Sequence, residues 1–143
     1  MTDPFNLQRF IAAQAVVYHT VVEELRTGEK RTHWMWFIFP QIQGLGGSAM
    51  ARQYAISSRD EARAYLDHPI LGARLRECTQ LVIDQRDLNG RTVHEIFSSP
   101  DDLKFRSCMT LFEAVAGSDS VFRTALVKYF RGERDGLTLA RME

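Results

Sequence analysis

Residues 3–28, DPFNLQRFIAAQAVVYHTVVEELRTG, carry the longest helical pattern in the chain. Apolar side chains recur there at steps of three and four residues, at Leu7, Phe10, Ile11, Tyr18, Val21, Val22 and Leu25. Asp3 before Pro4 is a typical helix start, because the carboxylate caps free N–H groups and proline fits the first helical position. Gly28 is a typical helix end. The stretch therefore predicts an amphipathic helix of about five to six turns, with one polar residue, Gln14, inside its apolar stripe.

Capping residues recur at short intervals after this helix. They predict further helices over about 48–54, 58–66, 67–84, 99–117 and 120–130, and a short turn from Thr92. Residues 133–143 are predicted to form a frayed tail or a short docked turn. No window shows sustained strand alternation. The sequence thus predicts an all-α fold, a compact single domain over residues 1–143 with about six to eight short-to-medium helices and no substantial sheet.

The composition is that of an ordinary globular domain, with 45% hydrophobic and 25% charged residues. Eighteen basic residues balance eighteen acidic ones, which argues against a nucleic-acid or membrane-surface partner. Cys78 and Cys108 are expected to be reduced core thiols rather than a disulfide. The four histidines show no ligand spacing, so we expect no metal and no cofactor. No secretion signal or membrane span is visible, and a cytoplasmic location is the expectation. The oligomeric state stays open.

The segment from Lys30 to Ser48 is chemically unusual. Its aromatic run, residues 34–39 (WMWFIF), fits either a buried strand or a short buried helix, and the helical surroundings favour the helix. Gly44, Gly46 and the helix cap Ser48 follow, in a loop that could present backbone N–H groups to an anion. The alternative is that the glycines only make a tight turn.

Other side chains of this segment supply the remaining groups of an anion site. Arg31 would add charge, Trp34 or Trp36 a stacking face, and Gln41 polar contacts. The alternative is that both tryptophans are core residues. His33 is the candidate acid or base if any chemistry takes place, although no partner carboxylate can be identified in the sequence.

Two polar residues outside the segment are further candidates. Gln14 either hydrogen-bonds a backbone group in the core or faces a pocket beside the first helix. Lys104 lies at the edge of an apolar helix face, where a lysine either extends to solvent or binds an anion in a cleft.

The chain resembles a bacterial family known as domain of unknown function 1810, some of whose members are labelled "calpastatin". The resemblance covers nearly the whole chain and is carried by Asp3-Pro4-Phe5, Arg9-Phe10, Ala13-Gln14, 30–41 (KRTHWMWFIFPQ), Gly44-Leu45-Gly46, Ser48, 68–72 (HPILG), 101–104 (DDLK) and 109–112 (MTLF). It implies a compact all-α domain without established catalytic residues. The calpastatin label fits poorly, because calpastatins are long disordered inhibitors and this chain is apolar-rich and well capped.

Two functions follow as hypotheses. The first is a pocket for a small anionic or nucleotide-like metabolite, formed by the first helix and residues 30–48 with Lys104. The second is a protein-interaction or structural module without catalytic activity, in which residues 34–39 contact a partner or a second copy.

Overall fold

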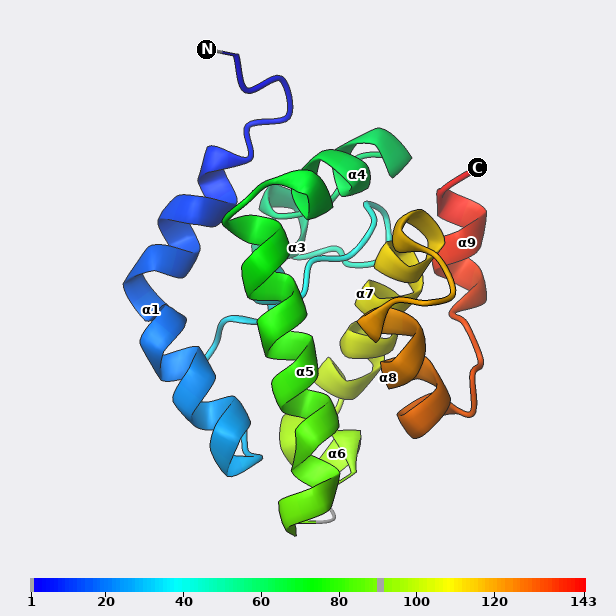
Figure 1. The fold of residues 1–143 in the computed structure, drawn as a ribbon. Coiled ribbons are helices and arrows are strands. Elements are labelled where there is room, and N and C mark those ends of the chain that lie inside the picture. The colour runs from blue at the N-terminus through cyan, green and yellow to red at the C-terminus, as the bar shows by residue number, and fades with distance from the viewer. Residues whose placement is uncertain (1, 90–91) are drawn as a thin grey trace.

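The computed structural model describes residues 2–89 and 92–143, which contain nine helices and no strand (Figure 1). In chain order these are α1 (Gln8–Thr27), α2 (Met35–Ile38), α3 (Ala49–Gln53), α4 (Arg59–Asp67), α5 (Leu71–Asn89), α6 (Val93–Phe97), α7 (Asp101–Ala116), α8 (Val121–Phe130) and α9 (Gly136–Arg141). The all-α prediction is confirmed, and so is the short helix in the aromatic run. The prediction of six to eight helices is too low, because α9 forms within the segment expected to be a tail or a single turn.

The first helix starts later than predicted. Asp3 and Pro4 lie outside α1, and the Asp3 carboxylate instead accepts hydrogen bonds from the backbone N–H groups of Leu7, at 2.8 Å, and Gln8, at 3.0 Å. These bonds lower the pKa of Asp3. Gly28 ends the helix as predicted, with a left-handed φ of 76°.

Four of the other helices, α3, α4, α6 and α8, begin at side-chain caps where the sequence indicates. Ser48, Ser58, Thr92 and Ser120 each accept a backbone N–H of the following turn. Thr92 and Glu95 form a complete capping box. The pair Ser58 and Glu61 has the same spacing but forms only half of a box, because the Glu61 carboxylate binds Ser57 and Arg9 instead.

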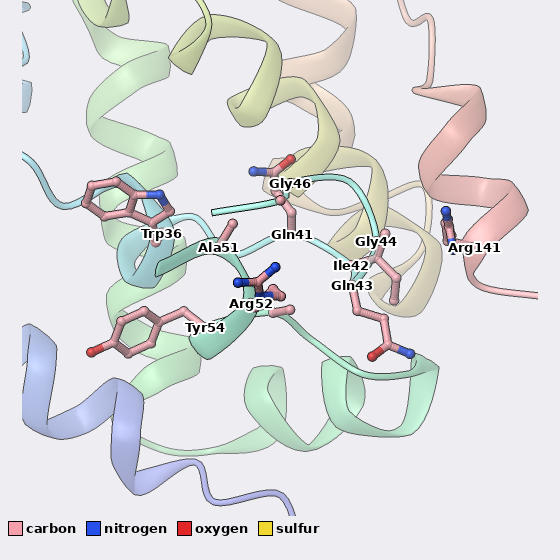
Figure 2. A pocket seen from close by; sticks show the side chains of 12 residues that line it. Trp36, Gln41, Ile42, Gln43, Gly44, Gly46, Ala51, Arg52, Tyr54 and Arg141 are labelled. Carbon is pink, nitrogen blue, oxygen red and sulfur yellow. The ribbon is translucent and has the colours of Figure 1, made fainter. Parts of the chain in front are cut away.

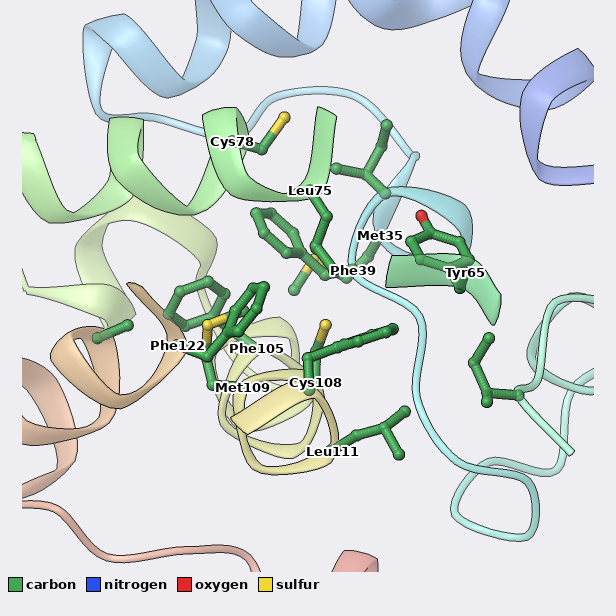
Figure 3. Close-up of a cluster of buried hydrophobic side chains, with 14 of the residues drawn as sticks. Met35, Phe39, Tyr65, Leu75, Cys78, Phe105, Cys108, Met109, Leu111 and Phe122 are labelled. Carbon is green, nitrogen blue, oxygen red and sulfur yellow. The ribbon is translucent and has the colours of Figure 1, made fainter. Parts of the chain in front are cut away.

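The core lies between α5 and α7. Helix α5 packs against α1, α4 and α8, and α7 packs against α4, α6, α8 and α9 (Figure 1). Phe105, Cys108, Met109 and Phe112 on α7 are fully buried, and Figure 3 shows this α7 face meeting side chains from α2 and α5. Both cysteines are free and buried, as predicted, and burial raises the pKa of Cys78 to about 12. No helix in the described ranges is long and apolar enough to cross a bilayer.

The C-terminal helix α9 is fixed to α7 by polar contacts rather than by apolar burial alone. The Arg134 guanidinium donates two hydrogen bonds of 2.7 Å to the Glu113 carboxylate, which lower the pKa of that carboxyl. Asp135 caps α9 by accepting from Thr138, and it also accepts a 3.0 Å hydrogen bond from the Ser107 hydroxyl on α7. These bonds hold the last turn of the chain, including Arg141, in a defined place.

Candidate binding pocket

The loop that follows the aromatic run is pinned to the start of the α3–α4 connection. Ile42 and Ile56 form an isolated parallel bridge, in which the Gln43 N–H donates to Ile56 O and the Ile56 N–H donates to Gln41 O, both at 2.8 Å. Both isoleucine side chains are buried in the core. The bridge leaves residues 43–47 projecting as a glycine-rich loop beside α3.

A pocket of about 470 Å³ lies between this loop, α3 and the end of α9 (Figure 2). Its size is within the range of small-molecule sites, roughly 300–1,000 Å³. It is lined by Trp36, Gln41, Ile42, Gln43, Gly44, Gly46, Gly47, Ala51, Arg52, Tyr54, Ala55 and Arg141. The lining residues thus come from α2, the loop, α3, the residues after α3, and α9.

Two arginines give the pocket a positive character. Within the described residues, neither Arg52 nor Arg141 makes a side-chain hydrogen bond or ion pair, and no aspartate or glutamate lines the pocket. Three other cations contrast with them, because Arg9, Lys30 and Arg134 each bind a carboxylate at 3.0 Å or less. Neither pocket guanidinium group is therefore paired with a carboxylate of the described residues.

Gly44 allows Arg141 to approach the loop. A Cβ atom at Gly44 would lie 2.7 Å from the central guanidinium carbon of Arg141, closer than side-chain atoms approach one another. Gly44 also adopts a left-handed φ of 93°, which favours glycine. The loop and the Arg141 side chain thus meet at a position where the left-handed backbone disfavours any residue other than glycine.

Aromatic residues line the opposite end of the pocket. In Figure 2, Trp36 and Tyr54 lie at one end of the lining residues and Arg141 at the other, with Arg52 and Gln41 between them. The Tyr54 ring packs against Phe37, at a centroid distance of 5.3 Å, and against Phe10, at 5.8 Å. This packing fixes the Tyr54 ring before any ligand binds.

The structure brings four of the ten candidate site residues into the pocket, namely Trp36, Gln41, Gly44 and Gly46. Ser48 lies next to it and caps α3 through a hydrogen bond from the Ala51 N–H. Because α3 has only five residues, few aligned peptides contribute to its dipole, so the predicted attraction of an anion to this helix start has little basis.

Gln14 lies in the core and not in the pocket. It is 1% exposed, its amide donates to Phe37 O at 2.7 Å and to the Tyr65 hydroxyl at 3.0 Å, and its carbonyl accepts from Arg74 at 3.3 Å. Of the two alternatives for Gln14, a hydrogen bond to a backbone group in the core is therefore the one observed, and the backbone group belongs to α2. The pocket predicted beside the first helix is thus displaced toward α3 and α9.

Trp34 and its neighbours are organised by a buried carboxylate. Glu24 on α1 accepts hydrogen bonds from Trp34 Nε1, the Arg31 N–H, and both the N–H and the hydroxyl of Thr32. Burial alone would raise the pKa of Glu24, but these four hydrogen bonds lower it. Trp34 is fully buried, so it provides no stacking face for a ligand.

The remaining candidates lie outside the pocket. The Arg31 side chain is exposed and pairs with Glu29 at 3.6 Å. His33 is exposed, is not among the lining residues, and makes no side-chain hydrogen bond or ion pair in the described ranges. Lys104 pairs with Asp101 at 3.5 Å and lies 5.7 Å from the Trp36 ring centroid, so it borders the pocket only through that ring. Among the described residues, no histidine, cysteine, aspartate, glutamate or lysine therefore lines the pocket.

The aromatic run is core. Trp34, Met35, Phe37, Ile38 and Phe39 are buried, and only Trp36 is partly exposed. The second hypothesis, a contact with a partner through residues 34–39, lacks the exposed apolar surface that it requires.

Sequence reasoning missed eight of the twelve lining residues, among them Arg52, Tyr54 and Arg141. The sequence pattern places Arg52 and Tyr54 in a short helix, and Arg141 in a frayed tail or a short docked turn. The usable local signal is the cluster of glycines at positions 44, 46 and 47, directly before the predicted helix that carries Arg52. The pairing of the loop with Arg141 is a long-range contact, which local patterns do not encode.

The fold and the pocket describe a small all-helical protein with a cationic, partly aromatic cavity. The chain belongs to the family described as "Protein of unknown function (DUF1810)", which matches residues 4–142. The solved structures include a similar protein, the conserved hypothetical protein Rv1873 from Mycobacterium tuberculosis, in a crystal structure at 1.38 Å. The two chains are 54% identical, the match covers 96% of each, and the TM-score is 0.91. No curated protein matches the chain.

Proposed function

We propose that this protein binds a small anionic metabolite, such as a phosphorylated compound, in the pocket between the glycine-rich loop, α3 and the end of α9. The observation that carries the proposal is the presence of Arg52 and Arg141 in one cavity without any lining carboxylate. A guanidinium group forms its strongest hydrogen bonds with an anion that accepts two of them at once, such as a phosphate or a carboxylate.

Further groups in the pocket suit the same ligand. In the described part of the chain, the N–H groups of Gly44, Gly46 and Gly47 donate to no protein acceptor, and neither does the side-chain amide of Gln41. Neutral donors of this kind add hydrogen bonds to an anion that the arginines attract. In this arrangement, the protein holds the ligand without a reacting group of its own.

The proposal predicts that phosphorylated metabolites raise the melting temperature of the protein and that this effect requires both arginines. A ligand at a hundred times its Kd stabilises the fold by about 2.7 kcal/mol, which for a chain of this length raises the melting temperature by several degrees. Inorganic phosphate, ribose 5-phosphate and AMP are suitable probes in a thermal-shift assay. We expect Arg52→Gln and Arg141→Gln each to weaken binding by about 10- to 100-fold, the worth of hydrogen bonds to a charged group.

Arg26→Gln is the matched control, because Arg26 is an exposed arginine on α1 whose only carboxylate contact is a 3.7 Å pair with Glu23. All three variants should melt close to the wild type without ligand, since exposed residues without close partners contribute little to stability. Equal loss of binding in Arg26→Gln, or unchanged binding in both pocket variants, would show that the ligand does not use this pocket.

A further inference from the structure

The pocket has two chemically different ends, and this separation constrains the ligand further. The anion-binding groups, Arg141 and the glycine loop, lie at one end, and the rings of Trp36 and Tyr54 lie at the other (Figure 2). A bare phosphate or a sugar phosphate would leave the aromatic end empty. A ligand that matches both ends carries an anionic group and a flat ring on one molecule.

The aromatic end is built to hold a ring in a fixed position. Tyr54 is packed against Phe10 and Phe37, and it cannot turn away without breaking those contacts. Trp36 is steadied by Lys104, whose ammonium group lies 5.7 Å from the ring centroid and pairs with Asp101. Preorganised rings lose little conformational entropy when a ligand stacks on them.

Gln41 provides the polar contact between the two ends. Its side chain lines the pocket and makes no hydrogen bond with another described residue, whereas the Gln43 amide donates to Ser57 O at 3.1 Å. A carboxamide both donates and accepts, so the Gln41 side chain suits ribose hydroxyl groups or the edge of a base.

From these three features we infer that the ligand is a nucleoside phosphate, with its base against Trp36 and Tyr54 and its phosphate between Arg52 and Arg141. This inference rests on the proposed function, because it assigns a ligand class to the same pocket. Stacking of a base on an aromatic side chain is worth about 1–3 kcal/mol, which corresponds to roughly 5- to 150-fold in affinity.

The inference predicts that AMP binds at least about fivefold more tightly than ribose 5-phosphate. Isothermal titration calorimetry of AMP, ribose 5-phosphate, adenosine and inorganic phosphate measures the contribution of each part of the ligand. In Trp36→Leu we expect most of the preference for AMP over ribose 5-phosphate to be lost, because only the Tyr54 ring is left to stack on the base. Trp36→Phe keeps a ring at the same place and should restore most of the preference. Phe130→Leu removes a partly buried ring at the end of α8 and is the control for loss of an aromatic side chain.

The possible failures are distinguishable. Equal affinities of AMP and ribose 5-phosphate for the wild type would overturn the nucleotide inference and leave the anion pocket standing. An undiminished preference for AMP in Trp36→Leu would also overturn it, because the base would then lie elsewhere. Binding of adenosine as tight as that of AMP, or no binding by any of the four compounds, would overturn the proposed function itself.

Discussion

Replacement of Gly72 by alanine is expected to destabilise the protein by about 3 kcal/mol, the upper end of the usual cost of overpacking. A Cβ atom at this position would lie 2.0 Å from the carbonyl oxygen of Leu66. That oxygen belongs to the backbone of α4, so no side-chain rotation relieves the clash, and α4 and α5 must move apart. For a chain of this length we expect the melting temperature to fall by about 10 °C.

Gly136→Ala is the matched control for Gly72→Ala. A Cβ at Gly136 would meet no atom within 4 Å, and the residue starts α9, where alanine is the better helix former. Its expected change is within about 0.5 kcal/mol of zero. A Gly72→Ala protein that melts at the same temperature as Gly136→Ala would contradict the close contact of α4 with α5.

Replacement of Glu24 by alanine is expected to cost about 3 kcal/mol of unfolding free energy, because it leaves several donors without an acceptor. The unpaired Trp34 indole N–H accounts for the largest part of this cost, because the whole side chain is buried and water cannot replace the lost acceptor. The N–H groups of Arg31 and Thr32 lose the same partner, so the segment that leads into α2 loses its anchor to α1.

Glu23→Ala tests whether this effect belongs to the buried carboxylate. Glu23 precedes Glu24 in the same helix, but its side chain is 54% exposed and only pairs with Arg26. Exposed pairs contribute little, about 0–1 kcal/mol. Urea unfolding of the two variants, followed by far-ultraviolet circular dichroism, measures the difference. Similar midpoints for Glu23→Ala and Glu24→Ala would contradict the anchoring role.

The helices were largely predictable because their signals are local. Gly28, Ser48, Thr92 and Ser120 mark helix ends through contacts with residues three or four positions away, and all four do so in the structure. The start of α1 was wrong because Asp3 caps it from a distance of four residues through an intervening turn. Helix α9 is capped locally by Asp135, but the other bonds at its start, between Asp135 and Ser107 and between Arg134 and Glu113, join it to α7, and local patterns do not show these bonds.

The site was only half predictable for the same reason. The glycine-rich loop and Trp36 stand out in the sequence by composition, and they do line the pocket. Their partner Arg141 follows about a hundred residues later, and no local pattern links the two. For Gln14, the sequence indicates a buried polar contact, because the residue lies in an apolar stripe. The same signal fits both a pocket and a core hydrogen bond, so the sequence cannot decide between them.

In the proposed arrangement, an anion occupies the pocket beside Arg52 and Arg141. The most direct test is an NMR titration of the ¹⁵N-labelled protein with AMP, in which the shifts of individual backbone and indole N–H groups are followed. We expect saturable chemical-shift changes at the N–H groups of Gly44, Gly46 and Gly47 and at the indole N–H of Trp36. These changes should be lost in the Arg52→Gln, Arg141→Gln double variant. Shifts that cluster on another face of the protein, or that persist in the double variant, would contradict it.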